Sequence, residues 1–319
     1  MGIVIEPGIT LGGNIKVGFT GLPNNPISVT ISSSQKELNL STFVANLNVW
    51  DGYSAVTVTI NSGVYIWSAN TANAALDMGG KWPSGVTVIN NGYIMGMGGQ
   101  GGTYGSANGG NGGPAINLTD GIAIRNNSYI VGGGGGGASD NFAGGGGGAG
   151  GGYGGNTIES GANGGGQGGL IGGFGFNGLS NYAAGGGGGC VIPGTGGGYV
   201  STNGVPGDYD FPGYGGGSGG SGGAATRNYI SGTVQVWHYA GAGGGGWGQP
   251  GGNAGNDAII GNVGSIQSGS GGTANSAGVS TTTGTSNPIY YGGAGGPAIK
   301  TNGYSIIWVA TGTVWGSIS

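Results

Sequence analysis

The sequence has few charged side chains, one histidine and one cysteine. Its 319 residues include 6 Lys and Arg and 10 Asp and Glu, which give a formal net charge of −4. So few basic side chains cannot form the positive stripe that neutralises nucleic-acid phosphates, and nucleic acid is therefore excluded as a partner. The single cysteine, Cys190, excludes an internal disulfide framework and a cysteine-based zinc site.

Long apolar runs are also missing. No run reaches the length needed to span a bilayer, so we expect no membrane insertion. The first residues, Met1 to Glu6, do not place an apolar stretch after a basic one, as a Sec signal peptide would. A protein of this kind that acts outside the cell needs another route, such as virion assembly followed by lysis.

Glycine is present in great excess. The chain has 92 glycines and 11 prolines, a composition that often indicates disorder. Its 7 Trp, 15 Tyr and 6 Phe are more aromatic residues than a disordered chain usually carries. Collagen is excluded because the glycines form consecutive runs instead of occupying every third position. The longest block lies between Val131 and Tyr153, where glycine runs alternate with short spacers.

Consecutive glycines favour polyglycine II strands, which have three residues per turn and no internal hydrogen bonds. Without side chains, neighbouring strands can approach on all sides and pair backbone to backbone. We therefore predict a rigid polyglycine II sandwich, with unbroken glycine at inner strands and residues such as Gln100, Asn111 and Gln167 at exposed ones. The block 132–152 is predicted to form two adjacent inner strands joined by a tip at 138–143.

The chain is expected to have three parts and a mostly irregular and β fold. Residues 1–35 contain short strand and turn signals and form an N-terminal attachment segment. Residues 36–95 form a small α+β module, and residues 96–319 form the glycine-rich sandwich with variable loops.

Within the small module, residues 36–49 carry the one good helix signal, with Asn39 or Ser41 as the cap. Apolar residues at 40, 43, 44 and 47 share one face of this helix. The strand signals at 55–60 and 64–67 flank an Asn-Ser-Gly turn, which predicts a β-hairpin.

Two phrases recur along the chain. Asn-x-Tyr-Ile begins at Asn91 and Asn127, with looser copies at Asn228 and Asn302. Gly-Gly-x-Gly-Gly-Pro-Ala-Ile occurs at 109–116 and, with Ala at x, at 292–299. The repeats suggest layers of short strands and glycine strands, with a core position for the tyrosines of the first phrase, Tyr93, Tyr129 and Tyr304. The irregular spacing does not predict a regular solenoid.

These phrases, with the opening segment 88–102 and the ending 306–318, resemble the glycine-rich tail-fibre tip adhesins (receptor-recognising proteins) of T-even-type and related tailed phages. The resemblance covers about residues 36–319 and does not extend to 1–35. It implies an amino-terminal part that joins a phage tail-fibre protein, a distal polyglycine II sandwich, and variable loops. It also implies that these loops contact a bacterial outer-membrane protein or surface glycan.

Aromatic and acidic residues in the segments between glycine runs are the candidate receptor-binding residues. Aromatic rings bury much area for few torsions, and acidic groups add electrostatic selectivity. The candidates are Tyr104, Asp140, Phe142, Phe176, Tyr182, Tyr199, Asp208, Tyr209, Asp210, Phe211, Trp237, His238 and Tyr239.

No motif predicts catalysis, a cofactor or a metal. GxGxxG matches are expected by chance at this glycine content, and none opens a helix after a strand. Local sequence does not support pairing of His238 with Cys190, and Asp208 and Asp210 fit a solvated loop tip better than an ion site.

The sequence thus predicts a non-enzymatic phage adhesin at a tail-fibre tip. A structural polyglycine filament or virion subunit without a receptor role stays open. An ice-binding protein is a further alternative, but regular Thr or Ala arrays would be expected for it, and the interruptions here are long and irregular.

Overall fold

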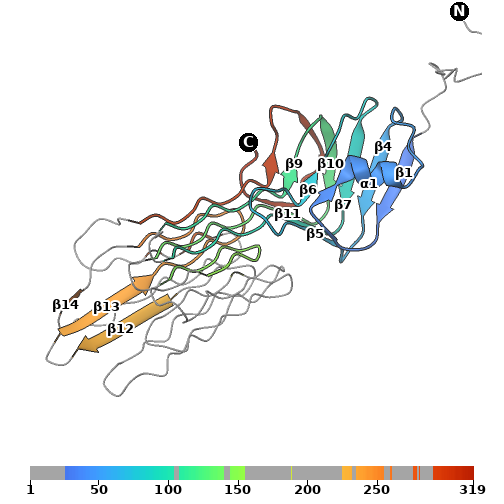
Figure 1. Cartoon of the computed structure of the whole chain (residues 1–319). Helices are drawn as coiled ribbons and strands as arrows, with labels where there is room; N and C mark the ends of the chain where they lie inside the picture. Colours follow the sequence, from blue (N-terminus) through green and yellow to red (C-terminus); the bar gives the residue numbers. More distant parts are fainter. Residues whose placement is uncertain are drawn as a thin grey trace, which may run out of the picture.

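The computed structural model describes residues 26–103, 108–139, 144–154, 188, 241–254, 276–278, 280 and 290–319, and the backbone of 225–231, 235–240 and 259–260. In this part of the chain the fold is mostly β and irregular, with one short helix and stacked parallel strands (Figure 1).

Three parallel sheets form a solenoid in which each of the first four turns adds one strand to each sheet, and the last adds a strand to two of them. Sheet A contains β1 (Ile27–Ile31), β4 (Val56–Ile60), β7 (Val86–Asn90), β10 (Ile122–Asn126) and β16 (Ile306–Ala310). Sheet B contains β2 (Gln35–Lys36), β5 (Tyr65–Trp67), β8 (Tyr93–Met95), β11 (Tyr129–Val131) and β17 (Thr313–Trp315). Sheet C contains β3 (Leu38–Asn39), β6 (Leu76–Asp77), β9 (Ile116–Asn117) and β15 (Ile299–Lys300).

The predicted hairpin is therefore wrong. β4 pairs in parallel with β1 and β7 in sheet A, whereas β5 pairs in parallel with β2 and β8 in sheet B. The turn at 61–63 makes a corner between two sheets, because each strand finds its partners in the neighbouring turns of the solenoid. Asn-Ser-Gly chemistry suits such a corner as well as a hairpin, since Gly63 has a φ of 75°.

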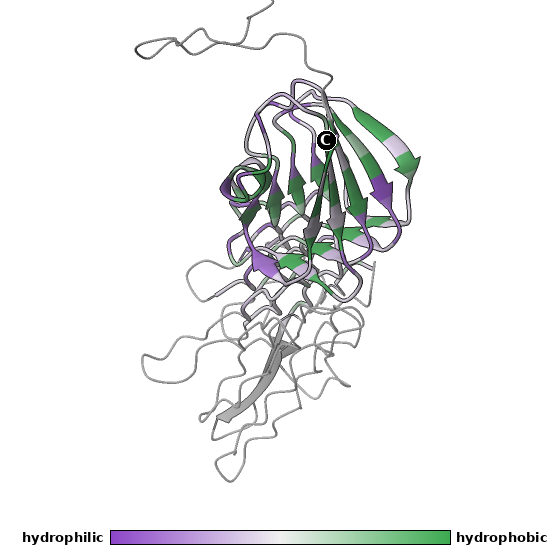
Figure 2. Ribbon diagram, turned by 90° about the vertical axis from the view of Figure 1, so that its right-hand side faces the viewer, coloured by the Kyte–Doolittle hydropathy of each residue, from purple (hydrophilic) through white to green (hydrophobic). Residues whose placement is uncertain are grey.

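Alternation along each strand fills the inside of the solenoid. Val56, Val58 and Ile60 of β4 are buried, and the threonines between them are half-buried on the outer face. Val88 and Ile124 continue the same inner row in the next two turns. Figure 2 shows these hydrophobic residues recurring across the stacked strands of sheet A. Burial of branched apolar side chains is what holds this part together.

Two buried asparagines hold the corner between sheets A and B. The Asn90 amide Nδ2 donates to Asn126 Oδ1 at 2.8 Å and to the Tyr129 carbonyl at 3.0 Å. The Asn126 amide Nδ2 donates to the carbonyls of Thr311 at 2.8 Å and Thr313 at 3.0 Å. Each side chain therefore ties its own turn of the solenoid to the next one.

The helix α1 (Leu40–Asn46) follows β3, and its cap is the predicted Asn39, whose Oδ1 accepts from the Thr42 N–H at 3.0 Å. Leu40 and Val44 are buried as expected. The helix is shorter than the predicted span 36–49 because β2 and β3 occupy residues 35–39, and Leu47 is exposed beyond its end.

The glycine runs leave the solenoid after β8 and β11 and return before β9 and β15 (Figure 1). They are packed side by side and joined by backbone hydrogen bonds. The segments 132–139 and 144–152 lie next to each other, since the N–H groups of Gly134 and Gly137 donate to the carbonyls of Ala149 and Gly146 at 2.7 and 2.8 Å. The predicted adjacency of these two segments is confirmed.

The run 132–138 sits in the centre of this packing. Its N–H groups donate in a cycle of three, with residues 133 and 136 bonded to the run 110–113, residues 134 and 137 to 146–149, and residues 135 and 138 to 249–252. Its carbonyls accept in the same cycle from three other runs, 99–102, 242–248 and 293–296. The run therefore has six backbone neighbours.

Candidate functional site

The glycine packing excludes side chains from its centre. A Cβ atom built on Gly134 would lie 2.5 Å from the Gly246 carbonyl oxygen, and one on Gly136 would lie 2.9 Å from the Gly101 nitrogen. Real Cβ contacts are longer than this, so every such position accepts only glycine without a shift of the backbone. Gln100 and Asn111, predicted at outer positions, are exposed, whereas Gln167 lies outside the described residues.

Asparagine side chains bond to backbone N–H groups at the edge of the described glycine runs. Asn108 Oδ1 accepts from the Tyr291 N–H, and Asn111 Oδ1 accepts from the Ala294 N–H, both at 2.9 Å. Asn253 Oδ1 accepts from the Gly292 N–H at 2.9 Å. The sequence analysis missed this role, although the spacing of three between the first two asparagines matches the cycle of the glycine runs.

These contacts fix the ends of the interrupting segments that were predicted to bind a receptor. The segment 104–107 lies outside the described residues. Before it in the sequence, the Gly102 N–H donates to the Gly137 carbonyl at 2.8 Å, and after it Asn108 is held by its bond to Tyr291. The segment 140–143 is bracketed by Ser139 and Gly144, both buried. A rigid base of this kind positions a variable loop without requiring that the loop itself be part of a core.

Most predicted receptor-binding residues lie outside the described residues, and the structure neither groups nor separates them. They are Tyr104, Asp140, Phe142, Phe176, Tyr182, Tyr199, Asp208, Tyr209, Asp210 and Phe211.

The remaining three candidates lie in β13 (Gln235–Gly241), which pairs with β12 (Ala225–Ser231) and β14 (Ile259–Ile260) in an antiparallel ribbon. The ribbon belongs to the glycine part of the chain, which comprises the residues between β8 and β9 and between β11 and β15. It lies at the end of this part that is remote from the solenoid (Figure 1).

Aromatic side chains mark the junction between the solenoid and the glycine runs. On sheet B, Tyr65, Tyr93 and Tyr129 stack with ring centroids 4.8 and 5.5 Å apart. Partial burial raises the pKa of the Tyr93 hydroxyl, and the neighbouring tyrosines add to this. Trp247 is fully buried in the same cluster, in the glycine part of the chain.

The prediction that Tyr304 belongs to the core is wrong. It is exposed in the turn before β16, where its hydroxyl accepts from Lys81 Nζ at 2.9 Å. The Asn-x-Tyr-Ile phrase at 302 therefore differs in position from those at 91 and 127, whose tyrosines are aligned in sheet B.

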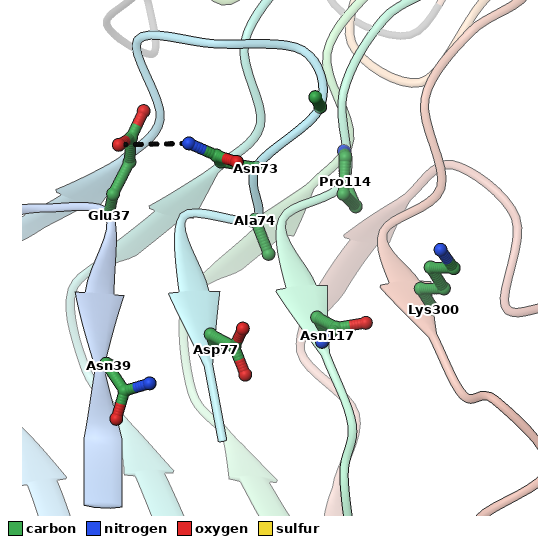
Figure 3. Close-up of a pocket in the computed structure, with 9 residues that line it drawn as sticks. Glu37, Asn39, Asn73, Ala74, Asp77, Pro114, Asn117 and Lys300 are labelled. Carbon is green, nitrogen blue, oxygen red and sulfur yellow. Dashed lines mark hydrogen bonds between the residues drawn. The ribbon is translucent and has the colours of Figure 1, made fainter. Parts of the chain in front are cut away.

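A groove of about 360 Å³ crosses the outer face of sheet C (Figure 3). Four polar residues from adjacent strands form its floor, and they are aligned by the strand register: Asn39, Asp77, Asn117 and Lys300. It was not foreseen from the sequence, because short two-residue strands give no periodic signal.

Neither a metal centre nor a membrane span was found in the described part of the chain. There, no three or more His, Cys, Asp or Glu side chains are grouped in a way that suits an ion, and the pair Asp208 and Asp210 lies outside that part. No helix in these ranges has the length and hydropathy needed to cross a membrane.

Comparison with known proteins supplies the family. Residues 26–216, more than half of the chain, match the sequence profile of the family described as phage tail fibre adhesin Gp38. One similar solved structure is the gp37–gp38 adhesin tip complex of the bacteriophage S16 long tail fibre. It is 20% identical, with a TM-score of 0.46, and the match covers 92% of this chain and 82% of that one. A comparison with curated proteins gave no match.

Proposed function

Because the chain belongs to the Gp38 family of phage tail fibre adhesins, we propose that its glycine part presents loops that bind a receptor on the bacterial surface. The receptor is an outer-membrane protein or a surface glycan. The family is one of adhesins, which agrees with the prediction of a tail-fibre virion protein that is not an enzyme. The observation that carries the proposal is the closed packing of the run 132–138, which makes a rigid base for the segments on its edges.

We infer that the glycine runs form a polyglycine II sandwich. The support is the cycle of three in the hydrogen bonds of residues 132–138, since a polyglycine II strand has three residues per turn. The six neighbours of this run agree with strands that bond outward in all directions. Antiparallel β pairing would instead send successive N–H groups alternately to two neighbours.

The receptor contact is assigned to the aromatic and acidic residues of the interrupting segments and of β13. Two observations support this: the ribbon β12–β13 lies remote from the solenoid, and Ser139 and Gly144, which flank residues 140–143 in the sequence, are buried. Aromatic side chains among small polar residues are typical of binding surfaces that must vary without loss of fold.

We assign fibre attachment to the N-terminal region, residues 1–35. The expected bounds 36–95 and 96–319 do not follow the solenoid, which includes β1 from the first part and β9–β11 and β15–β17 from the last. The S16 structure is a complex of gp37 and gp38, and a fibre protein is the corresponding partner here. β1 offers a physical basis, because among the described residues it pairs with β4 alone and lies at the edge of sheet A, where a further strand could add.

Two experiments test the receptor proposal. Purified protein should bind susceptible cells and block adsorption of the phage that carries it. Exchange of residues 190–214 and 224–247 between relatives should move host range, with exchange of the exposed helix segment 45–49 as a control that leaves it unchanged. If no host is bound and the protein polymerises, the structural alternative replaces the adhesin.

A measurement of thermal hysteresis tests the alternative that the protein binds ice. Sheet A carries a short threonine array on its outer face, with Ser28, Thr30, Thr57, Thr59 and Thr87 in adjacent strands. The array stops at Ile89, next to Thr59, so it is too short to match an ice lattice, and we expect no hysteresis.

A further inference from the structure

The groove on sheet C combines hydrogen-bond donors and acceptors in one straight row. Asp77 is aligned with Asn39 on one side and Asn117 on the other, and Lys300 follows Asn117. Adjacent strands are about 4.8 Å apart, so the row extends over about 14 Å. Figure 3 shows the four side chains on the same face, each from its own strand.

Part of the hydrogen-bonding capacity of this row is used to build the groove. Asn39 Oδ1 caps α1, Asp77 Oδ1 accepts from the Gly79 N–H at 2.9 Å, and Asn117 Oδ1 accepts from the Asn302 amide at 2.9 Å. These bonds fix the three side chains and leave the two amide Nδ2 groups and Asp77 Oδ2 for a ligand. Among the described residues no hydrogen bond or ion pair engages Lys300 Nζ.

Glu37 forms the wall at one end of the row. It has a φ of 49°, a conformation that glycine or asparagine adopts more readily. Its carboxylate accepts from the Ala69 N–H and from the Asn73 amide, both at 3.2 Å, and so holds the loop that borders the groove. Figure 3 shows the Glu37–Asn73 bond above the row.

We propose that this groove binds a short, neutral, hydroxyl-rich oligosaccharide that crosses the strands. Hydroxyl groups both donate and accept, so they match a row that alternates amide donors, a carboxylate acceptor and an ammonium donor. An anionic phosphate is disfavoured because Glu37 and Asp77 outnumber Lys300. An apolar peptide is disfavoured because the non-polar lining consists of Ala72, Ala74 and Pro114, which bury little area.

This site is separate from the receptor loops. It lies on the solenoid, whereas β13, which holds three of the candidate receptor-binding residues, lies at the end of the glycine part that is remote from the solenoid (Figure 1). Without an aromatic platform, the affinity of one groove is expected to be weak, with a Kd of about 1 mM. Several copies on one virion would raise the overall avidity, which suits a first reversible contact with a glycan-coated cell.

The test measures binding of maltotetraose and of tetra-N-acetylchitotetraose to the full chain by saturation-transfer NMR and titration. At least one of the two sugars should bind, and Lys300→Met should weaken that binding about tenfold, because a hydrogen bond from a charged group is lost. Lys36→Met is the matched control, since Lys36 is an exposed lysine on the neighbouring sheet and outside the groove. It should leave the affinity unchanged.

Asp77→Asn tests the acceptor and keeps an oxygen for the Gly79 N–H. Melting temperatures of both groove variants should equal that of the parent chain, since neither residue is buried. Absence of binding by both sugars overturns the proposal, and so does equal weakening by Lys300→Met and Lys36→Met. A chain with exchanged segments 190–214 and 224–247 should keep sugar binding while host range moves, so failure of the loop proposal is distinguishable from failure of this one.

Discussion

The solenoid and the glycine packing are held together in opposite ways. Inside the solenoid, side chains such as Ile124 and Val58 are fully buried and fill the space between three sheets. Around the run 133–137 the space is filled by backbone atoms, and each N–H and carbonyl is bonded to another run. Buried apolar side chains therefore stabilise the solenoid, whereas the glycine packing forms because its residues have no side chains to separate the backbones.

This difference predicts opposite sensitivities to mutation. Loss of methyl groups should harm the solenoid, while gain of a single methyl group should harm the packing. Ordering glycine costs more backbone entropy than ordering any other residue, so the packing needs its complete set of backbone hydrogen bonds to be stable.

The largest expected effect is from a side chain placed in the centre of the packing. Gly134→Val and Gly136→Val should prevent folding of the glycine part, because even a Cβ would collide with the backbone of neighbouring runs. Soluble yield and the thermal unfolding transition are the measurements. Gly121→Ala is the matched control, since a Cβ there meets Ser305 Oγ at an ordinary 3.4 Å and should cost little. Unchanged melting of the valine variants would disprove the closed packing.

The next effect concerns the core of the solenoid. Ile124→Ala removes a fully buried side chain from the inner row of sheet A and should lower the free energy of unfolding by about 2–5 kcal/mol. Ile307→Ala, in the neighbouring strand, removes a side chain that is 66% exposed and should change it by less than about 0.5 kcal/mol. Chemical denaturation of both variants measures the contrast. Similar losses would mean that this end of the solenoid is covered by a partner.

A smaller effect is expected at the asparagine corner. Asn126→Ala leaves the carbonyls of Thr311 and Thr313 without their donor and should cost about 1–3 kcal/mol. Asn127→Ala removes an exposed bond to Asn91 and should cost much less. Equal denaturation midpoints for the two variants would contradict a structural role for the buried amide.

The glycine part was easier to foresee than the solenoid, for a physical reason. A run without side chains, such as 132–137, can be buried where its backbone pairs with other backbones. The adjacency of this run to 144–152 and the exposure of Gln100 could therefore be predicted from steric exclusion. The position of Asn39 as helix cap also followed from local chemistry.

Strand pairing, in contrast, depends on partners far along the chain. Ile27, Val56 and Val86 begin successive turns at nearly even spacing, but Ile122 and Ile306 are separated by most of the glycine part. The repeat of the solenoid is therefore not visible in the sequence, and local signals alone predict a hairpin at the turn 61–63. The groove was missed because its residues come together only through this pairing.

The smallest predicted effect is a pH dependence on the solenoid surface. The Asp120 carboxylate accepts from the N–H groups of Trp82 and Gly121, both at 2.9 Å, and these bonds hold its pKa below the ordinary 3.8. Because the folded pKa lies below the unfolded one, the stabilisation is fully present above the unfolded pKa. It is lost as the pH falls through the folded pKa.

Solvent screening keeps this contribution well under about 1 kcal/mol, since Asp120 is only half-buried in a surface turn. Melting temperatures measured from pH 6 to pH 2 should therefore fall slightly less steeply below about pH 4 for Asp120→Asn than for the parent chain. Asp120→Asn also weakens the bond to Trp82 at neutral pH, so its melting temperature should start slightly lower. Parallel curves would mean that Asp120 titrates alike in the folded and unfolded chains.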